Sequence, residues 1–294
     1  MENRLNDLSG SQWLFWTNTV WETNYSVDAT HPLRKAHGAM KPPEAMREII
    51  QFFTKKGESV LDPFAGVGGT LLGAALCGRQ ALGFEIDPRW AKVYAKIQKE
   101  FGVADGGLVA RKGRSDVEPI QPEMRVGDCL KLMRSLPEFF ADAIICDPPY
   151  GTEHAAHGFA DETNFSMTGV EDGDFGTTPD FDEFYRRMEL FGREAWRVLK
   201  AGRYLVVLCG DRYRRKEYLP LGVRVADVLR SVGFHLKGIK IWTNKSTLRR
   251  LRPYAVKTAF VPNITHQNVL ILRKEIRLSR LDRPSKGKRQ VSRR

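Results

Sequence analysis

Apolar runs and amphipathic segments alternate along most of this chain. Short apolar runs bounded by Gly, Pro or charged residues predict buried strands, and segments with apolar residues at helical spacing predict helices between them. Such alternation is typical of parallel β-α-β units, so we expect an α/β fold with a doubly wound, mostly parallel sheet. The expected strands are 59–64, 81–86, 125–127, 141–146, 204–209, 234–242 and 268–272, and the expected helices are 41–53, 70 onward, 88 onward, the segment ending at 136, 181–200 and 219–232.

Composition adds a basic balance to this pattern. The net charge is +12, which favours a polyanionic partner. Residues 276–294 contain eight Lys or Arg and one acid, so +7 of the charge lies there and +5 in the rest. We expect a single domain over 1–275 and a disordered tail over 276–294 that adds salt-sensitive affinity for nucleic acid. A solvated terminus without that role is the alternative.

The four cysteines are scattered, with no Cys-x-x-Cys pair. This spacing favours reduced thiols over disulfides or zinc. No long apolar run and no charged-then-apolar N-terminus occurs, so we expect neither a membrane span nor a signal peptide. These features together predict a cytoplasmic protein. The segment 11–25 holds five aromatic residues and is expected to cover the core.

The apolar run 141–146 ends abruptly in Asp147, Pro148, Pro149 and Tyr150. Two consecutive prolines donate no backbone hydrogen bond and fix φ, so the strand cannot continue and the turn is rigid. Rigid acceptors beside an exposed ring suit a planar ligand that carries an amino group. A strand followed by a proline turn, with the tyrosine packed in the core, is the alternative interpretation.

A glycine loop forms a second candidate site, where the strand 59–64 runs into Gly66, Gly68 and Gly69 before a helix. Glycines let a ligand approach the backbone closely, and the helix N-terminus adds amide donors. Glu85 ends the next strand, at about the ~20-residue spacing from the loop that carboxylates binding ribose hydroxyls have. Both S-adenosylmethionine and NAD fit these two features.

The order of these motifs resembles the amino-group DNA methyltransferases, which act on adenine N6 or cytosine N4. The resemblance covers residues 16–274 and implies a Rossmann-like, S-adenosylmethionine-dependent methyltransferase fold with a seven-stranded sheet. The helix at Lys41 looks like the family's motif X, the glycine loop like motif I, Glu85 like motif II and Asp128 like motif III. The resemblance implies that S-adenosylmethionine is bound by Lys41, Asp62, Pro63, Phe64, Ala65, Gly66, Gly68, Glu85, Ile86, Asp128, Cys129 and Asp147.

The same resemblance assigns catalysis to Asp147, Pro148, Pro149 and Tyr150. An exocyclic amine is a poor nucleophile because its lone pair is delocalised, and the Asp147 carboxylate and the Pro148 carbonyl would accept its two N–H groups. Tyr150 would stack on a base that has left the duplex. Cys146 suggests cytosine C5 methylation as a rival, but that chemistry is marked by Pro-Cys, so we expect a buried strand residue instead.

Two loops are candidates for contact with nucleic acid. Residues 243–263 contain five Lys or Arg and no acid, which predicts phosphate contacts, with a solvated loop as the alternative. Residues 151–185 contain nine Asp or Glu and no Lys or Arg, so we expect the loop 151–180 to repel phosphate and to act as a lid. His154 and His157 have no further placed ligand, so no metal is expected. The predicted phosphate-binding residues are Lys245, Arg249, Arg250, Arg252 and Lys257.

The predicted function is site-specific methylation of double-stranded DNA, at adenine N6 because Asp-Pro-Pro-Tyr is commoner in adenine enzymes. The alternatives are a cytosine N4 enzyme, a catalytically silent nucleic-acid-binding subunit, and a tRNA guanine-N2 methyltransferase, which Asp-Pro-Pro-Tyr-Gly also resembles. RNA is the less favoured partner, because the residues before Lys41 are too few for an extra RNA-binding domain. A restriction partner, the recognised site and the oligomeric state, a dimer included, stay open.

Overall fold

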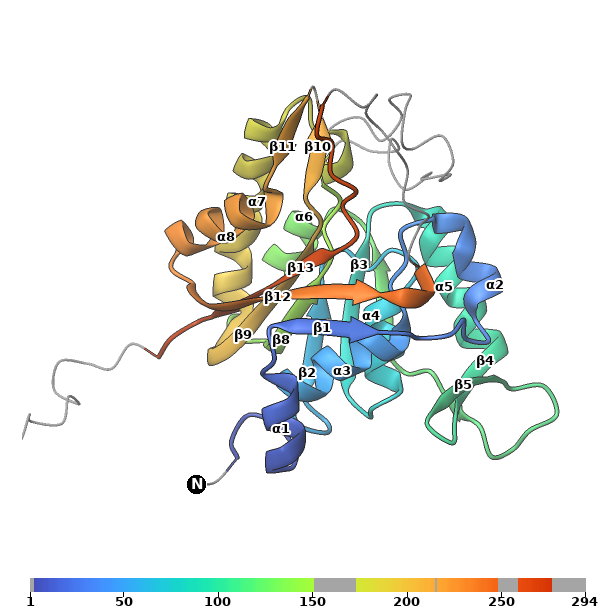
Figure 1. Ribbon diagram of the computed structural model, residues 1–294. Coiled ribbons are helices and arrows are strands. Elements are labelled where there is room, and N and C mark those ends of the chain that lie inside the picture. Colours follow the sequence, from blue (N-terminus) through green and yellow to red (C-terminus); the bar gives the residue numbers. More distant parts are fainter. Residues whose placement is uncertain (1–2, 151–172, 215, 248–258, 277–294) are drawn as a thin grey trace, which may run out of the picture.

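An eight-stranded sheet runs through the centre of the computed structural model, in the order β1-β12-β13-β9-β8-β2-β3-β7 (Figure 1). The structure describes residues 3–150, 173–214, 216–247 and 259–276. β13 is antiparallel to both of its neighbours, and the other adjacent pairs are parallel. The strands of this sheet are β1 (Val20–Thr23), β2 (Ser59–Asp62), β3 (Gln80–Glu85), β7 (Glu123–Val126), β8 (Ala141–Cys146), β9 (Leu199–Cys209), β12 (His235–Asn244) and β13 (Gln267–Arg273).

The winding of the sheet reverses between β2 and β8, which pair in parallel at its centre. From β2 the chain moves outward through β3 to β7, then returns to β8 and continues to β9 on the other side. Connections that leave two adjacent strands in opposite directions open a crevice at their carboxyl ends, where ligands bind in this class of fold. The predicted doubly wound α/β fold is confirmed.

Helices cover both faces of the sheet (Figure 1). α3, α4 and α5 pack on one face, and α6, α7 and α8 pack on the other. Successive residues of β8 belong to opposite cores, since Ala143 and Ile145 face the first group while Ile144 and Cys146 face the second. The helices are α1 (Gly10–Trp16), α2 (His31–Arg34), α3 (Pro43–Phe53), α4 (Gly69–Ala75), α5 (Pro88–Glu100), α6 (Cys129–Arg134), α7 (Phe181–Val198) and α8 (Leu221–Val232), with the 3-10 turns η1 (Lys35–His37), η2 (Phe175–Thr177) and η3 (Lys245–Thr247).

The aromatic segment 11–25 does more than cover the core, because it contributes the strand β1. β1 pairs in parallel with β12 and makes the sheet one strand wider than the seven predicted. Trp16 and Trp21 are buried, and Trp21 stacks on Trp242 of β12 with ring centroids 5.3 Å apart. The hydrophobic pattern did not predict this strand, because four residues are too few to establish an alternation of apolar and polar positions.

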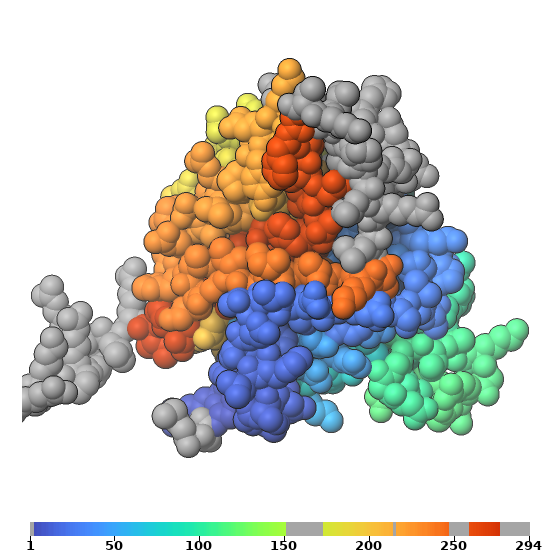
Figure 2. Space-filling model, in the orientation of Figure 1, coloured from blue at the N-terminus to red at the C-terminus, as the bar shows by residue number. Residues whose placement is uncertain are grey.

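Two further pairings were not predicted. A three-stranded sheet of β4 (Phe101–Ala104), β5 (Gly107–Ala110) and β6 (Glu118–Pro119) lies between α5 and β7 in the chain and protrudes from the body of the molecule (Figure 2). A hairpin of β10 (Arg212–Arg214) and β11 (Glu217–Leu219) follows β9, so α8 begins at Leu221 and not at the expected Leu219. Among the described residues, no helix has both the length and the apolar character needed to cross a membrane.

We expect Gly73→Ala to lower the free energy of unfolding by about 1–3 kcal/mol, because it overpacks the contact between α4 and α3. An added Cβ would lie 2.8 Å from the backbone nitrogen of Arg47 and 2.8 Å from the carbonyl oxygen of Pro43. Gly10→Ala is the matched control, since no atom lies within 4 Å of its added Cβ. Urea denaturation of both variants measures the difference, and equal midpoints would contradict the prediction.

Candidate active site

Four carboxylates gather at one edge of the sheet. Asp62 is the last residue of β2 and Glu85 the last of β3. Asp147 directly follows β8, and Asp128 caps α6 shortly after β7. These four strands are adjacent and parallel, so their carboxyl ends meet at the crevice where the winding reverses.

The loop between β2 and α4 is shaped by two glycines in the left-handed region. Gly66 has φ 53° and Gly68, the N-cap of α4, has φ 82°. A Cβ on Gly68 would lie 2.2 Å from an aromatic ring of α5, so only glycine fits there. The Asp62 carboxylate accepts from the Phe64 N–H at 3.0 Å, and the Gly66 N–H donates to Glu85 at 2.8 Å. The loop is thereby tied to the ends of both β2 and β3.

The other predicted cofactor-binding residues lie along the same edge. Pro63 and Ala65 are buried, and Ala65 donates its N–H to the carbonyl of Phe84 at 2.8 Å, which joins the loop to β3. Ile86 is half-buried beside Glu85. Cys129 is buried as the first residue of α6, directly after Asp128.

Burial makes two of these carboxylates unusually basic. Burial raises the pKa of Asp62 to about 7, and the nearby negative charge of Asp147 acts in the same direction. Burial likewise raises the pKa of Glu85 to about 7, against the lowering effect of backbone hydrogen bonds from Asp87 and Gly66. Near neutral pH both groups therefore exchange protons readily, and a cationic or hydroxylated ligand would favour their ionised forms.

Asp147 has a hydrogen-bond donor at each carboxylate oxygen. The Lys41 ammonium pairs with Oδ2, and the Tyr150 hydroxyl donates to Oδ1 at 2.7 Å. Gln267, at the start of β13, donates in turn to the Tyr150 hydroxyl at 2.8 Å. Burial raises the pKa of Tyr150 well above its usual value, so the hydroxyl stays protonated and remains a donor.

The predicted end of β8 at Cys146 is confirmed, and Pro148 is buried in the turn that follows. The four cysteines are free thiols. Burial raises the pKa of the Cys146 thiol well above its usual value. A fully buried, protonated thiol is a poor nucleophile, which argues against the cysteine chemistry of cytosine C5 methylation.

Lys41 reaches this site because its backbone packs directly on the glycine loop. An added Cβ on Gly69 would lie 3.0 Å from the Lys41 carbonyl oxygen. A side chain at Gly69 would therefore push the residues before α3 away from the loop. The same contact places the Lys41 side chain between the loop and Asp147.

His37 borders the glycine loop and Trp90 packs on His37, and sequence reasoning missed both. His37 Nε2 lies 3.1 Å from the position of a Cβ on Gly66, and the two aromatic rings meet edge to face at 4.9 Å. Burial lowers the pKa of His37 to about 4, so the ring is neutral. Within the described part of the chain, His37 Nδ1 and Trp90 Nε1 are buried without a hydrogen-bond partner. Gln267 was missed as well, because 117 positions separate it from Tyr150.

The described end of the acidic stretch packs against the cofactor side of the site. Phe175 is buried and meets Phe64 edge to face at 5.0 Å. Asp174 accepts from a backbone N–H of η2 at 2.7 Å, and Asp180 caps α7. Glu183 pairs with two arginines of α7. These acids serve local structure. The expectation that the loop 151–180 repels phosphate stays a prediction, because residues 151–172 lie outside the described part of the chain.

Much of the predicted nucleic-acid interface lies outside the described residues. This applies to the loop residues 151–172 with His154 and His157, to Arg249, Arg250, Arg252 and Lys257, and to the tail 277–294. Lys245 is described, and its exposed side chain lies 3.7 Å from Glu22. No group of three or more metal-binding side chains occurs among the residues that the structure describes.

The fold and the motif order define a methyltransferase with a nucleoside cofactor. The family model for DNA methylases matches residues 2–96 and 141–282, and a model of RMKL-like methyltransferase domains matches residues 52–162. The chain belongs to the DNA methylase family, and its cofactor is S-adenosylmethionine. The residues present fit this cofactor in their chemistry, because the buried carboxylates of Asp62 and Glu85 lie at the strand ends beside the glycine loop, where they suit cationic and hydroxyl groups.

Similar proteins include type II methyltransferases and tRNA guanine-N2 methyltransferases. The type II methyltransferase M.MjaI of Methanocaldococcus jannaschii is 38% identical over 88 residues, which cover 30% of this chain and 28% of that protein. The tRNA (guanine(10)-N2)-dimethyltransferase of Methanothermobacter thermautotrophicus is 30% identical over 121 residues, which cover 41% and 30%. The match therefore spans less than a third of each relative's length. Among solved structures, TrmN from Thermus thermophilus has a TM-score of 0.47 at 16% identity, covering 83% of this chain and 53% of its own.

We expect S-adenosylmethionine to bind more tightly as the pH rises through 7. The sulfonium and ammonium of the cofactor favour ionised Asp62, and its ribose hydroxyls favour ionised Glu85, so binding expels protons from groups whose pKa is about 7. Each carboxylate that loses its proton should contribute about tenfold in affinity between about pH 6 and about pH 8. Calorimetry in buffers of different ionisation enthalpy measures both the affinity and the proton release.

Glu85→Gln provides the control, because it removes one titrating group and keeps its shape. We expect weaker binding in this variant, with a shallower pH dependence. A wild-type affinity that is constant over this pH range would contradict the prediction.

Proposed function

We propose that the protein transfers the methyl group of S-adenosylmethionine to the N6 amino group of adenine in double-stranded DNA. The observation that carries this proposal is the position of Asp147. Its carboxylate follows β8 beside the glycine loop of β2, in a rigid turn whose Pro148 carbonyl supplies a second acceptor. A site that holds two acceptors beside a methyl donor suits an exocyclic amine, which needs its lone pair directed at the methyl group.

The target amine must reach the Asp147 carboxylate, whose two oxygens now accept from Lys41 and Tyr150. Lys41 is the donor that can leave, because its side chain lies between Asp147 and the loop and can pair instead with a carboxylate bound there. Oδ2 then accepts an N–H of the target amine. S-adenosylmethionine, when bound, would supply the methyl group. Asp147 would direct the amine nitrogen toward it and would take up the proton that the nitrogen loses.

Tyr150 provides a ring face for the target base. Its hydroxyl donates to Asp147 and accepts from Gln267, which fixes the position of the hydroxyl end of the ring. A base that leaves the duplex loses its stacking, and contact with an aromatic face offsets this by about 1–3 kcal/mol. We infer base flipping from this requirement, since the amine of a stacked base cannot reach Asp147 inside the crevice.

A second candidate function is methylation of the N2 amino group of guanine in tRNA. The tRNA guanine-N2 dimethyltransferases, which align over 41% of the chain, favour it, as does the match to RMKL-like domains. The chemistry at Asp147 is the same for either amine. The substrate therefore depends on surfaces outside the crevice.

Asp147→Asn should lower the rate of methyl transfer by about 10²–10³-fold, because the amide replaces a charged acceptor with a weaker, partly donating group. Asp227→Asn, an exposed carboxylate on α8, should retain wild-type activity and controls for the charge change. The assay incubates labelled S-adenosylmethionine with duplex DNA or with tRNA and identifies the labelled nucleoside by mass spectrometry.

N6-methyladenine in DNA is the expected product. N4-methylcytosine would reassign the base, and N2-methylguanine in tRNA would establish the second candidate. Failure of the wild type to label either substrate would contradict both candidates and favour a catalytically silent subunit.

A further inference from the structure

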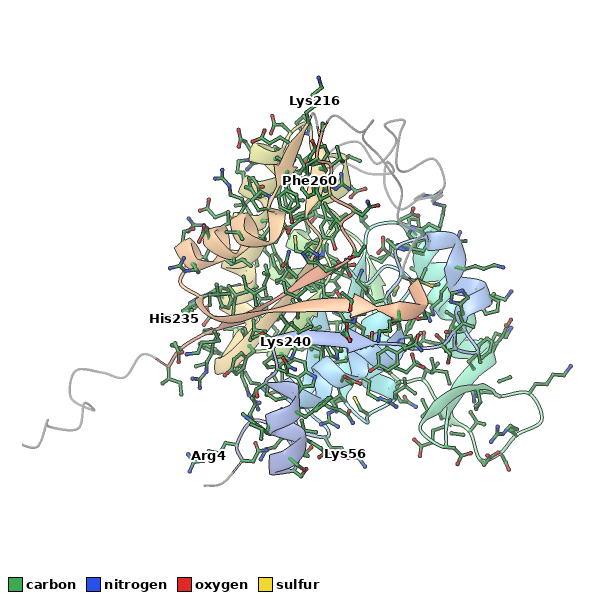
Figure 3. The ribbon with its side chains drawn as sticks, viewed as in Figure 1. Arg4, Lys56, Lys216, His235, Lys240 and Phe260 are labelled. Carbon is green, nitrogen blue, oxygen red and sulfur yellow. The ribbon has the colours of Figure 1, made fainter. Side chains whose placement is uncertain are left out.

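Gln267 lies at the edge of the sheet that holds Asp147, because β13 runs against its neighbours. β8 and β9 are parallel and end at this edge, whereas β13 is antiparallel to β9 and begins there. In Figure 3, Lys216 lies at this edge, on the hairpin that follows β9, and Lys56, which precedes β2, lies at the opposite edge. The first side chain of β13 is therefore placed beside the ends of strands that come much earlier in the chain.

Gly210, the residue after β9, lets the Tyr150 ring cross the end of that strand. Tyr150 follows β8 and Gln267 begins β13, and β9 lies between these two strands. Asn268 pairs with Cys209, so Gln267 lies level with Gly210. A Cβ on Gly210 would lie 3.3 Å from the Tyr150 ring and 3.8 Å from its hydroxyl oxygen, so a larger side chain would push the ring away. Glycine thereby allows the hydroxyl to reach a donor two strands from β8.

The hydrogen bonds at the Tyr150 hydroxyl run in one direction. An ionised carboxylate only accepts, so the hydroxyl proton points at Asp147 Oδ1, at 2.7 Å. The hydroxyl oxygen is then left to accept, and Nε2 of Gln267 donates to it at 2.8 Å. The three side chains therefore form a chain of hydrogen bonds that ends on one oxygen of the carboxylate.

This chain holds Oδ1 of Asp147 and leaves Oδ2 for exchange. Oδ2 pairs with Lys41, whose backbone packs on the glycine loop, so Oδ2 is the oxygen on the cofactor side. We propose that Gln267 is a positioning residue, which acts through Tyr150 to keep Oδ2 of Asp147 directed at the target amine. A carboxylate that rotates away no longer orients the lone pair of the amine. This inference rests on the proposed function, because it requires an amine at Asp147.

Gln267→Met tests this role, because methionine keeps the length of the side chain and removes the amide donor. Tyr150→Phe removes the hydroxyl and keeps the ring that would stack on the target base. Gln98→Met is the matched control, since the half-buried Gln98 donates to the Pro122 carbonyl at 2.8 Å and belongs to α5, outside β8, β9 and β13. Affinity for S-adenosylmethionine should match the wild type in all variants, which shows that they fold.

The measurement is the rate of methyl transfer in a single turnover. Enzyme in excess over the nucleic acid keeps slow product release from hiding the chemical step. Labelled S-adenosylmethionine supplies the methyl group, and the substrates are duplex DNA amplified in vitro, which carries no methyl groups, and a tRNA transcribed in vitro. The variants are compared on the substrate that the wild type labels.

We expect Gln267→Met and Tyr150→Phe each to lower this rate about tenfold, the effect of one lost hydrogen bond. The double variant should also be about tenfold slower than the wild type, and not about a hundredfold, because both changes break the same chain. Damage to the start of β13 alone would add to the effect of Tyr150→Phe. Gln98→Met should transfer methyl groups at the wild-type rate.

Two results from an active wild type would overturn the proposal and leave the proposed function in place. One is a wild-type rate in Gln267→Met, and the other is a double variant in which the two losses multiply. A wild type that labels neither duplex DNA nor tRNA would remove the proposed function together with this role of Gln267.

Discussion

The arrangement of the site depends on holding two carboxylates, Asp62 and Asp147, at the ends of adjacent buried strands. β2 and β8 pair through the middle of the sheet, so the fold itself forces the two groups together. Burial and the charge of Asp147 raise the pKa of Asp62, and the Lys41 cation opposes this rise. The cation reaches them only because Gly69 lets the start of α3 pack on the loop. A helix that precedes the first central strand is therefore an essential part of the site.

This shared cation couples the two halves of the crevice. Lys41 can neutralise Asp147 or a carboxylate bound over the glycine loop, but one ammonium cannot fully serve both. A bound carboxylate that drew Lys41 away would leave one oxygen of Asp147 free to accept a new hydrogen bond. Without such a ligand, Lys41 stays paired with Asp147. The pKa values of Asp62 and Glu85 are raised by burial. Cationic or hydroxyl groups of a ligand would therefore stabilise the ionised forms of both carboxylates.

The sequence predicted those parts of the site that are contiguous in the chain. The glycine loop and the end of β8 depend on local rules, because glycine and proline restrict the backbone wherever they occur. Glu85 could be predicted from its spacing alone. His37 and Gln267 could not, since they reach the site through tertiary packing and have no spacing relation to the loop or to Tyr150. β1 was missed for a related reason: its pairing with β12 joins opposite ends of the chain.

The number of charged residues in a segment said less about its surface than the contacts that each charged side chain makes. In the acidic stretch 151–185, the described acids Asp174 and Asp180 are helix caps, and Glu183 pairs with Arg186 and Arg187. A count of acids alone does not reveal these local roles. The β10–β11 hairpin makes the same point, because the Asp211 carboxylate at its base accepts two hydrogen bonds and the exposed Lys216 is followed directly by the exposed acid Glu217.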